Sequence, residues 1–521
     1  MNTFKKHVIY VVLTLVLSWA PLFAQIPSGD APVRLHDQGA LFQKPFQVAI
    51  DDLGWIQGSS LGDENGPWRA GVKRIIDVKD YQALVDIGKA AGTRMQGLFI
   101  LSEFDRLGVI RNYPHMTYQQ DRWDNSANIG PLQIQIMDFV KNNADYLEFG
   151  YHGVGHEFWD ENGRRTRAEY YNTDENSARP KELMELNLDV FENIMAQYGL
   201  SRKDGHSFPE VFVPPAYGYY WNPDSDYSTG SIMAARGLKY VNTNFAYISE
   251  LNPPGEGSGG FDNGVLVVDR QNFGNPWYEY ASLPRTPIGT YSTETIETHF
   301  PNLLAQDDFL QADITREWVD FYAEVQRHSE NYVAKNTEQF YSQWLYRRYT
   351  KVTEDRVGEI KINNTSMPDL VYERDMLGNM VITVPLKSGE HVSSATINNQ
   401  PISGYFEAEG YGFIYLPRLD KKEYTLKYTK GNSLPSNVVW NDGTYNVYEV
   451  QQARNRISLE VKMYGTQEVK FKSTRAARRI SSDNPRLRVI SSTFDAGKNE
   501  IVITVHGHDI QGEKGKITLE Y

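Results

Sequence analysis

The sequence predicts an α/β protein in which a (β/α) barrel-like domain is followed by C-terminal β-sandwich modules. Two observations support this prediction. Between residues 45 and 350, short apolar segments alternate with longer segments whose apolar residues have helical spacing, which is typical of a parallel sheet that closes, or nearly closes, into a barrel. From residue 351 onwards, short strand-like segments follow one another between Gly, Asn and Asp turns, as in β-sandwich proteins.

The strands and helices of the first part are predicted from the length and spacing of apolar runs. Short runs indicate strands, and longer runs with apolar residues three and four positions apart indicate helices. One aromatic-rich helix is predicted to extend without interruption from Ile314 to Tyr349. The other predicted helices cover 80–91 and 180–198, and the predicted strands cover 46–51, 95–101, 146–150 and 210–214.

The tail is predicted to consist of β-strands. We divide it at the Gly- and Pro-containing segment that begins at Gly431. Residues 351–430 then form a β-sandwich module, and residues 431–521 form a second β-rich module or a continuation of the first. The clearest strand-like segments are 380–384, 411–415, 424–428, 457–461 and 501–505.

The N-terminus has the features of an export signal. Lys5 and Lys6 precede an apolar run from Val8 to Trp19, and Ala24 is a small residue at the expected cleavage site. We therefore expect a signal peptide over residues 1–24 and a periplasmic or secreted protein without a membrane span. The chain has no cysteine, so neither disulfides nor lipid attachment through cysteine are expected.

Composition restricts the partners of the protein. The formal net charge is −13, whereas nucleic-acid binding requires a basic surface that displaces counterions. The acidic excess lies in the first 350 residues, which suits a metal site there. Aromatic residues make up 13% of the chain; they suit both sugar binding and the filling of hydrophobic cores.

Polar side chains follow three of the predicted strands. Asp51 and Asp52 end the first strand, His152 and His156 follow the third, and residues 214–218 follow a later one. In a parallel barrel, the carboxyl ends of the strands gather on one face. Two histidines four positions apart can share one helical turn and face one ion, and Asp52 completes a set of two histidines and one carboxylate. The alternative is a buried histidine pair that caps a helix.

These motifs resemble those of the metal-dependent polysaccharide deacetylases related to chitin-oligosaccharide deacetylase, over residues 45–345. The resemblance implies that Asp51 is the catalytic base, His299 the general acid, and Asp52, His152 and His156 the metal ligands. It also implies that Tyr217, in the segment Pro215-Ala216-Tyr217-Gly218, borders the developing oxyanion. The implied ion is divalent, zinc in many members, with manganese, nickel or cobalt as alternatives.

The chain departs from the family pattern at two places. Gly153 replaces the hydroxyl residue that follows the first histidine, so one loop-stabilising hydrogen bond is expected to be missing. Phe212 and Val213 occupy the region of the arginine that steadies the catalytic aspartate. Arg270 could take over that role, or it could bind an anionic substrate.

Two further segments suggest substrate contacts. Arg164 and Arg165 lie in a short basic cluster that ends at Arg167, and guanidinium groups bind carboxylate and sulfate through two hydrogen bonds. A solvated turn is the alternative explanation for this cluster. Trp221, at the end of an aromatic run, could form a sugar platform or part of a core.

Three functions follow from these observations. The first is a secreted metal-dependent enzyme that removes acetyl groups from an oligo- or polysaccharide. The second is a dehydratase that eliminates water from the non-reducing-end uronic acid of an anionic, ulvan-like oligosaccharide, as the resemblance to divergent exported relatives implies. The third is a non-catalytic glycan-binding protein.

Overall fold

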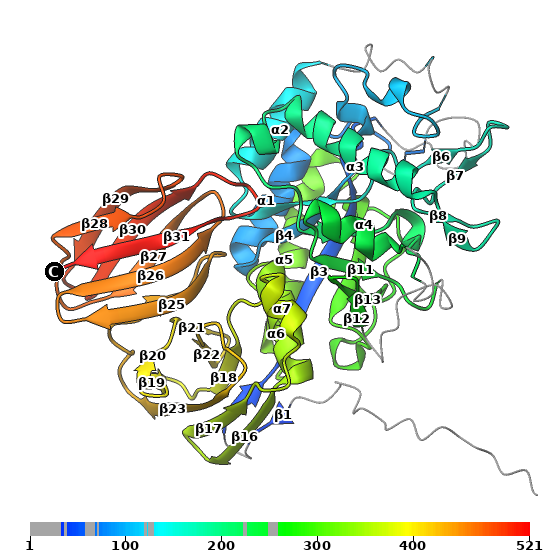
Figure 1. The fold of residues 1–521 in the computed structure, drawn as a ribbon. Helices are drawn as coiled ribbons and strands as arrows, with labels where there is room; N and C mark the ends of the chain where they lie inside the picture. Colours follow the sequence, from blue (N-terminus) through cyan, green and yellow to red (C-terminus); the bar gives the residue numbers. More distant parts are fainter. Residues whose placement is uncertain are drawn as a thin grey trace, which may run out of the picture.

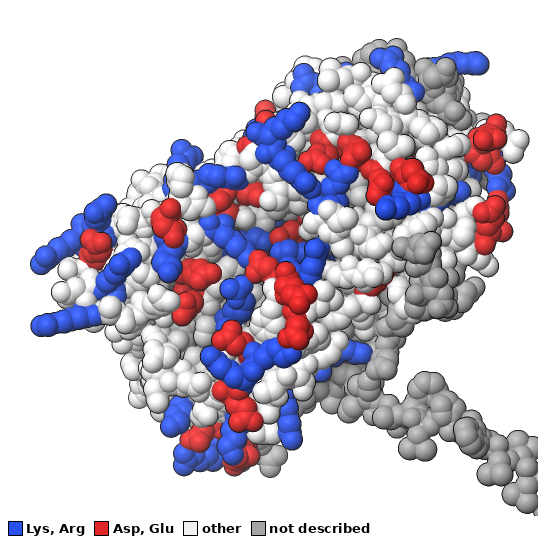
Figure 2. Space-filling model, in the orientation of Figure 1, with Lys and Arg blue, Asp and Glu red and all other residues white. Residues whose placement is uncertain are grey.

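The computed structural model describes residues 33–35, 39–57, 68–69, 72–118, 122, 130–221, 227–247 and 259–521. The predicted signal peptide of residues 1–24 lies outside these ranges. Within them, no helix has both the length and the apolar character needed to cross a membrane. The face drawn in Figure 2 carries acidic and basic side chains interspersed with one another.

Seven parallel strands close into a barrel (Figure 1). Each strand pairs with the next around the ring, and the last pairs with the first over five residues. In order around the ring, the strands are β3 (Lys44–Leu53), β4 (Met95–Phe99), β5 (Leu147–Tyr151), β10 (Val211–Phe212), β11 (Tyr240–Thr243), β13 (Val265–Gln271) and β14 (Thr295–His299). The predicted parallel barrel is confirmed as a closed one. The sequence had indicated four of its strands, β3, β4, β5 and β10.

Helices pack against the outside of the barrel. Alternate residues of β3, namely Phe46, Val48 and Ile50, share one hydrophobic core with them, as expected where successive side chains of a strand point to opposite faces. These helices are α1 (Val78–Ala91), α2 (Pro131–Asn142), α3 (Lys181–Ala196), α4 (Thr229–Arg236) and α5 (Gln311–Arg327). α1 and α3 confirm the helices predicted at 80–91 and 180–198.

The single helix predicted from Ile314 to Tyr349 is wrong. α5 ends at Arg327, strand β15 (Asn331–Val333) then pairs with the start of β3, and a second helix, α6 (Thr337–Tyr349), follows. Asn336 begins α6, since its side chain accepts a hydrogen bond from the backbone of Gln339, as N-cap residues do. Aromatic residues on both sides of the interruption made the pattern look continuous.

α6 closes the amino-terminal end of the barrel. It shares a hydrophobic core with side chains that point into the barrel, and the rings of Tyr240 and Tyr341 stack with centroids 4.2 Å apart. The inward-pointing residues of this core include Ala49, Leu98, Val213, Leu266 and Val268. The carboxyl ends of the strands, at the other end, therefore remain for a functional site.

Most of the tail belongs to three antiparallel or mixed sheets (Figure 1), one of which also includes two short strands that precede the barrel in sequence. The nine-stranded sheet contains β1 (Val33–Arg34), β2 (Leu41–Phe42), β18 (Val381–Pro385), β22 (Tyr411–Tyr415), β21 (Gly404–Ala408), β24 (Val439–Trp440), β27 (Thr466–Lys472), β30 (Glu500–Gly507) and β29 (Leu487–Asp495). The five-stranded sheet contains β16 (Lys351–Arg356), β17 (Glu359–Asn363), β23 (Glu423–Gly431), β19 (His391–Ile397) and β20 (Gln400–Pro401). The four-stranded sheet contains β25 (Asn446–Ala453), β26 (Arg456–Met463), β31 (Glu513–Glu520) and β28 (Arg479–Ser482).

The break predicted at Gly431 does not separate two independent sheets. β21 pairs with β24 across it, with Tyr405 opposite Trp440. The nine-stranded sheet is therefore continuous through both halves of the tail. The hydrophobic core between the four-stranded sheet and the far end of the nine-stranded sheet is nevertheless separate from the core around α6.

Buried polar contacts join the tail to the barrel. Lys462 of β26 donates to Glu210, which precedes β10, and to Glu338 of α6, at 2.8 and 2.9 Å. Arg94 donates to the carbonyl of Ile510, and Gln511 to the carbonyl of Phe149. The tail therefore supports the end of the barrel that lies opposite the open strand ends.

Replacing Glu338 with Gln is expected to destabilise the whole chain. The change leaves the buried ammonium of Lys462 with one carboxylate instead of two, and removing one partner of a buried pair costs about 3 kcal/mol. Urea unfolding measures this loss. Asp355→Asn, which removes an exposed partner of Lys361, is the control and is expected to leave stability unchanged. Equal stability of both variants would contradict the role given to Lys462.

Candidate metal centre and active site

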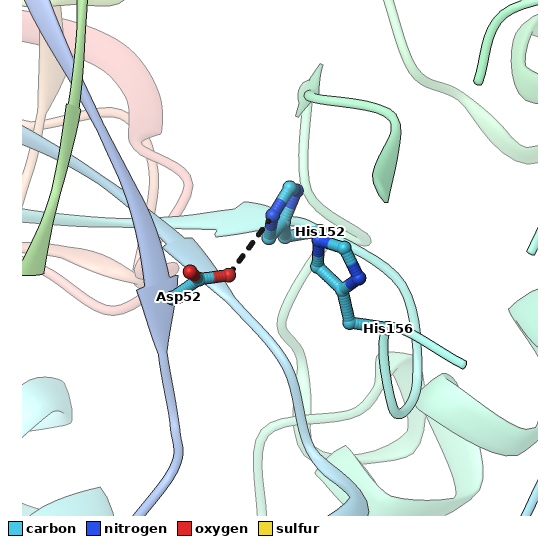
Figure 3. Close-up of side chains that lie close together, drawn as sticks. All are labelled: Asp52, His152 and His156. Carbon is cyan, nitrogen blue, oxygen red and sulfur yellow. Dashed lines mark ion pairs between the residues drawn. The ribbon is translucent and has the colours of Figure 1, made fainter. Parts of the chain in front are cut away.

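The three predicted metal ligands meet at the open end of the barrel (Figure 3). Asp52 comes from β3, and His152 and His156 come from the segment after β5. All three are buried, and one ligand atom of each lies within 4.8 Å of the others. Asp52 Oδ1 and His152 Nε2 are 3.3 Å apart. This buried group could hold a metal ion, and it is the only such group among the described residues.

The hydrogen bonds around the triad fit a cation. His152 Nδ1 lies 2.7 Å from the carbonyl of Val213, so Nδ1 carries a hydrogen and Nε2, which faces Asp52, is the nitrogen that can bind a proton or a metal ion. Both carboxylate oxygens of Asp52 are buried without a hydrogen-bond partner among the described residues. Burying a carboxylate without a partner is costly, and a cation or a proton beside Asp52 would offset this cost.

The pKa values of the two histidines agree with this arrangement. Burial lowers the pKa of His156 to about 3, so its imidazole is neutral, as a metal ligand must be. Burial would also lower the pKa of His152, but the charges of Asp51 and Asp52 outweigh burial and raise it. The two carboxylates therefore attract positive charge to this position, whether a proton on His152 or a cation between the ligands.

The two histidines do not share a helical turn, contrary to the prediction. Residues 152–157 form an irregular loop, in which Gly153 and His156 have φ angles of 89° and 55°. The carboxylate of Glu169 accepts the backbone N–H groups of Val154, Gly155 and His156 at 2.6–3.1 Å. The loop is thus held by a buried carboxylate instead of by helical hydrogen bonds.

Glu169 also explains Gly153. A Cβ atom at position 153 would lie 2.5 Å from Glu169 Oε2, and the positive φ angle by itself favours glycine. Gly153 has no hydroxyl to stabilise the loop, but Glu169 accepts several hydrogen bonds from the loop, out of the space that a side chain at position 153 would occupy.

A bulge turns two consecutive aspartates towards one pocket. Neighbouring residues of a regular strand point to opposite faces, yet Asp51 lines the pocket and Asp52 belongs to the triad. The pairing of β3 with β4 shifts register between Ile50 and Leu53, and Asp52 has a φ angle of 69°. Such a bulge re-aims a side chain at the cost of local strain.

Arg270 holds Asp51 in place. Its two terminal nitrogens donate to the two oxygens of Asp51 at 2.8 and 2.6 Å. Burial would raise the pKa of Asp51, but the charge of Arg270 outweighs it and lowers the pKa to about 2. Arg270, at 1% exposure, is thus bound to Asp51 and is not available as a clamp for substrate.

His299 and Tyr217 lie at the same pocket. His299 ends β14, and its Nε2 is 3.9 Å from Asp52 Oδ2. The hydroxyl of Tyr217 donates to Glu297, a fully buried residue that the sequence interpretation missed. The Glu297-x-His299 spacing at a strand end was the available signal, because residues two apart on a strand share one face.

The rest of the pocket wall is mostly aromatic. Its cavity volume is about 20 Å³, enough for an ion or one water molecule, so a sugar must bind at its mouth. Trp277 and Tyr247 are 37% and 54% exposed there. The lining residues that were not predicted individually as site residues are Arg167, Ala216, Tyr247, Trp277 and Tyr278.

Three predicted substrate-binding residues are not among the lining residues. Arg164 is exposed and pairs with Asp160 and Asp174 in a surface turn. The guanidinium of Arg165 lies over the rings of Trp68 and Trp159. Trp221 packs against the barrel core. Arg167, which follows Arg164 and Arg165 in the sequence, lines the pocket instead, and so does another tryptophan, Trp277.

Comparisons with known proteins do not identify the chain. No protein-family model matches it, and no curated protein matches it. The chemistry of the pocket is therefore inferred from its geometry.

His152→Ala is expected to abolish metal binding, because it removes one of three ligands and the one that Val213 orients. Metal content after zinc loading and dialysis, measured by mass spectrometry, tests this. His391→Ala is the control, since His391 lies in the tail beside Glu407. Full metal content in the His152 variant would overturn the assignment of the triad.

Glu169→Ala is expected to weaken metal binding by about tenfold to a hundredfold, as loss of an outer-shell partner does. The reason is that the backbone N–H groups of the ligand loop lose their common acceptor. Competition with a chelating dye measures the affinity. Glu161→Ala, an exposed change nearby, is expected to have no effect; the same loss in both variants would contradict the role of Glu169.

Proposed function

We propose that the chain is an exported, metal-dependent carbohydrate-active enzyme that resembles the polysaccharide deacetylases and removes acetyl groups from an oligo- or polysaccharide. One observation carries the proposal. The candidate metal ligands, a carboxylate fixed by an arginine, and a histidine meet at one buried pocket, through Asp51, Arg270 and His299. This combination would provide a cation site, a base and an acid within reach of one acetyl group of the substrate.

The residues of the pocket divide the reaction between them. A divalent cation, zinc in the first instance, would polarise the acetyl carbonyl and make a water molecule more acidic, which matters because Asp51 is a weak base. Asp51 takes the proton as the water oxygen bonds to the acetyl carbon. His299 protonates the sugar oxygen or nitrogen as its bond to the acetyl carbon breaks. The products are acetate and a free hydroxyl or amine.

A second candidate is dehydration of a uronic acid, and the conformation of Tyr217 favours it. The backbone N–H of Tyr217 donates to Pro214, and its hydroxyl donates to Glu297. Both donors are therefore engaged, although acetyl hydrolysis needs donors for an oxyanion. In dehydration, a base removes the proton beside the carboxylate, the neighbouring C–O bond breaks, and a protonated group completes the departing water. His299, which ends β14 beside Asp52, would take the latter role.

Product analysis separates these reactions. Zinc-loaded protein is incubated with acetylated oligosaccharides and with uronic-acid oligosaccharides. Deacetylation yields free acetate, whereas dehydration yields a product lighter by one water that absorbs in the ultraviolet. If neither product forms with zinc, manganese, nickel or cobalt supplied, both enzyme proposals fail and the glycan-binding alternative is left.

Asp51→Asn is expected to keep the metal and to lower turnover by at least about a hundredfold, the contribution of a positioned base. Asp51 is not one of the three ligands, so metal content separates the two effects. Asp86→Asn, on the exposed face of α1, is the control and is expected to keep full turnover. Undiminished turnover of the Asp51 variant would exclude Asp51 as the base.

A further inference from the structure

We propose that Arg167 forms an anion-binding subsite beside the metal centre, so that the substrate carries a carboxylate or sulfate close to the reacting bond. This inference rests on the proposed function, because it takes the pocket to be a carbohydrate-processing site. It assigns the anion-binding role to a single residue of the basic cluster at 164–167.

The position of Arg167 supports this role. Arg167 lines the same pocket as Asp51, His156 and Tyr278. Its guanidinium carbon lies 5.0 Å from the centroid of the Trp68 ring. The Trp68 ring in turn lies 6.1 Å from that of His156 and 6.4 Å from that of Tyr278. Arg167 is therefore held against the wall of the pocket, next to a candidate metal ligand.

The charge of Arg167 is not balanced within the described part of the chain. No described carboxylate lies within ion-pair distance of it, whereas Arg270 pairs with Asp51 and Arg69 with Glu103. Arg167 is also half-buried, where water solvates a cation less well and an anionic partner is worth more. A ligand that brings a negative charge would provide that partner.

The chemistry of the Arg167 guanidinium favours a planar or a tetrahedral oxyanion as the ligand. Trp68 covers one face of the guanidinium through a cation–π contact. The N–H groups lie in the plane of the guanidinium, and together they bind carboxylate or sulfate through paired hydrogen bonds. A neutral sugar hydroxyl would satisfy one donor without balancing the charge.

The other arginines near the pocket do not fit this role. Both terminal nitrogens of Arg270 donate to Asp51. Arg164 is exposed and paired with Asp160 and Asp174. Arg165 touches Trp68 from outside the pocket lining. Arg167 is thus the one described cation that both lines the pocket and has no described acidic partner.

The test compares three zinc-loaded proteins: the wild type, Arg167→Gln and the matched control Arg164→Gln. Calorimetry measures the affinity of each for an oligogalacturonate, for its carboxyl-reduced neutral counterpart, and for a sulfated neutral oligosaccharide. Asp51 is kept in all three, because removing it would free Arg270 to bind anions. The carboxylate and sulfate arms distinguish the two sources of negative charge.

The wild type and Arg164→Gln are expected to bind at least one charged oligosaccharide about tenfold or more tightly than the neutral one, the effect of a charge-assisted hydrogen bond. Arg167→Gln is expected to lose this preference and to keep its metal. Equal binding of charged and neutral sugars by the wild type, absence of binding to all three, or an equal effect of both substitutions would overturn the proposal. Product formation by the same wild-type preparation tests the proposed function separately.

Discussion

The candidate centre depends on two consecutive aspartates that face one pocket. In a regular strand Asp51 and Asp52 would point to opposite sides of the barrel wall. The bulge after Ile50 and the positive φ angle of Asp52 bring both carboxylates to the open end. Two adjacent negative charges at a buried place require matched positive charge. Arg270 provides it for Asp51, and a cation held with His152 and His156 would provide it for Asp52. The different roles proposed for Asp51 and Asp52 thus follow from one local distortion.

The strained backbone around the pocket is held in place by hydrogen bonds and by packing. Asp52, His156, Ala216 and Tyr217 all have positive φ angles between 53° and 69°, which non-glycine residues rarely adopt without compensation. The compensation is visible around the ligand loop, where Glu169 binds three successive N–H groups. At the opposite end, α6 fills the barrel and the tail packs behind it. Closure of one end leaves the strand ends at the other as the place for chemistry.

The sequence predicted the parts that local patterns determine. Apolar alternation indicated β3, β4, β5 and β10, and the ligand types and spacings indicated the three residues that meet in the structure. Contacts between residues far apart in the chain leave no local sequence pattern, so they could not be predicted. Glu169 acts thirteen to fifteen residues from the groups that it binds, and Arg270 reaches Asp51 across 219 positions. The strands β11, β13 and β14 were not predicted, and their length is not the reason, because β14 has five residues, as many as the predicted β4.

The basic cluster shows why composition alone assigns roles poorly. Its arginines have the same side chain, yet each has a different environment: Arg164 is paired at the surface, Arg165 lies on aromatic rings, and Arg167 faces the pocket. What distinguishes them is the surroundings to which the backbone after the ligand loop directs each side chain. Arg165 and Arg167 both lie over the Trp68 ring, but only Arg167 also lines the pocket. The anion subsite proposed at Arg167, beside the candidate metal centre, would bring the charged group of a sugar close to the bond that is proposed to break.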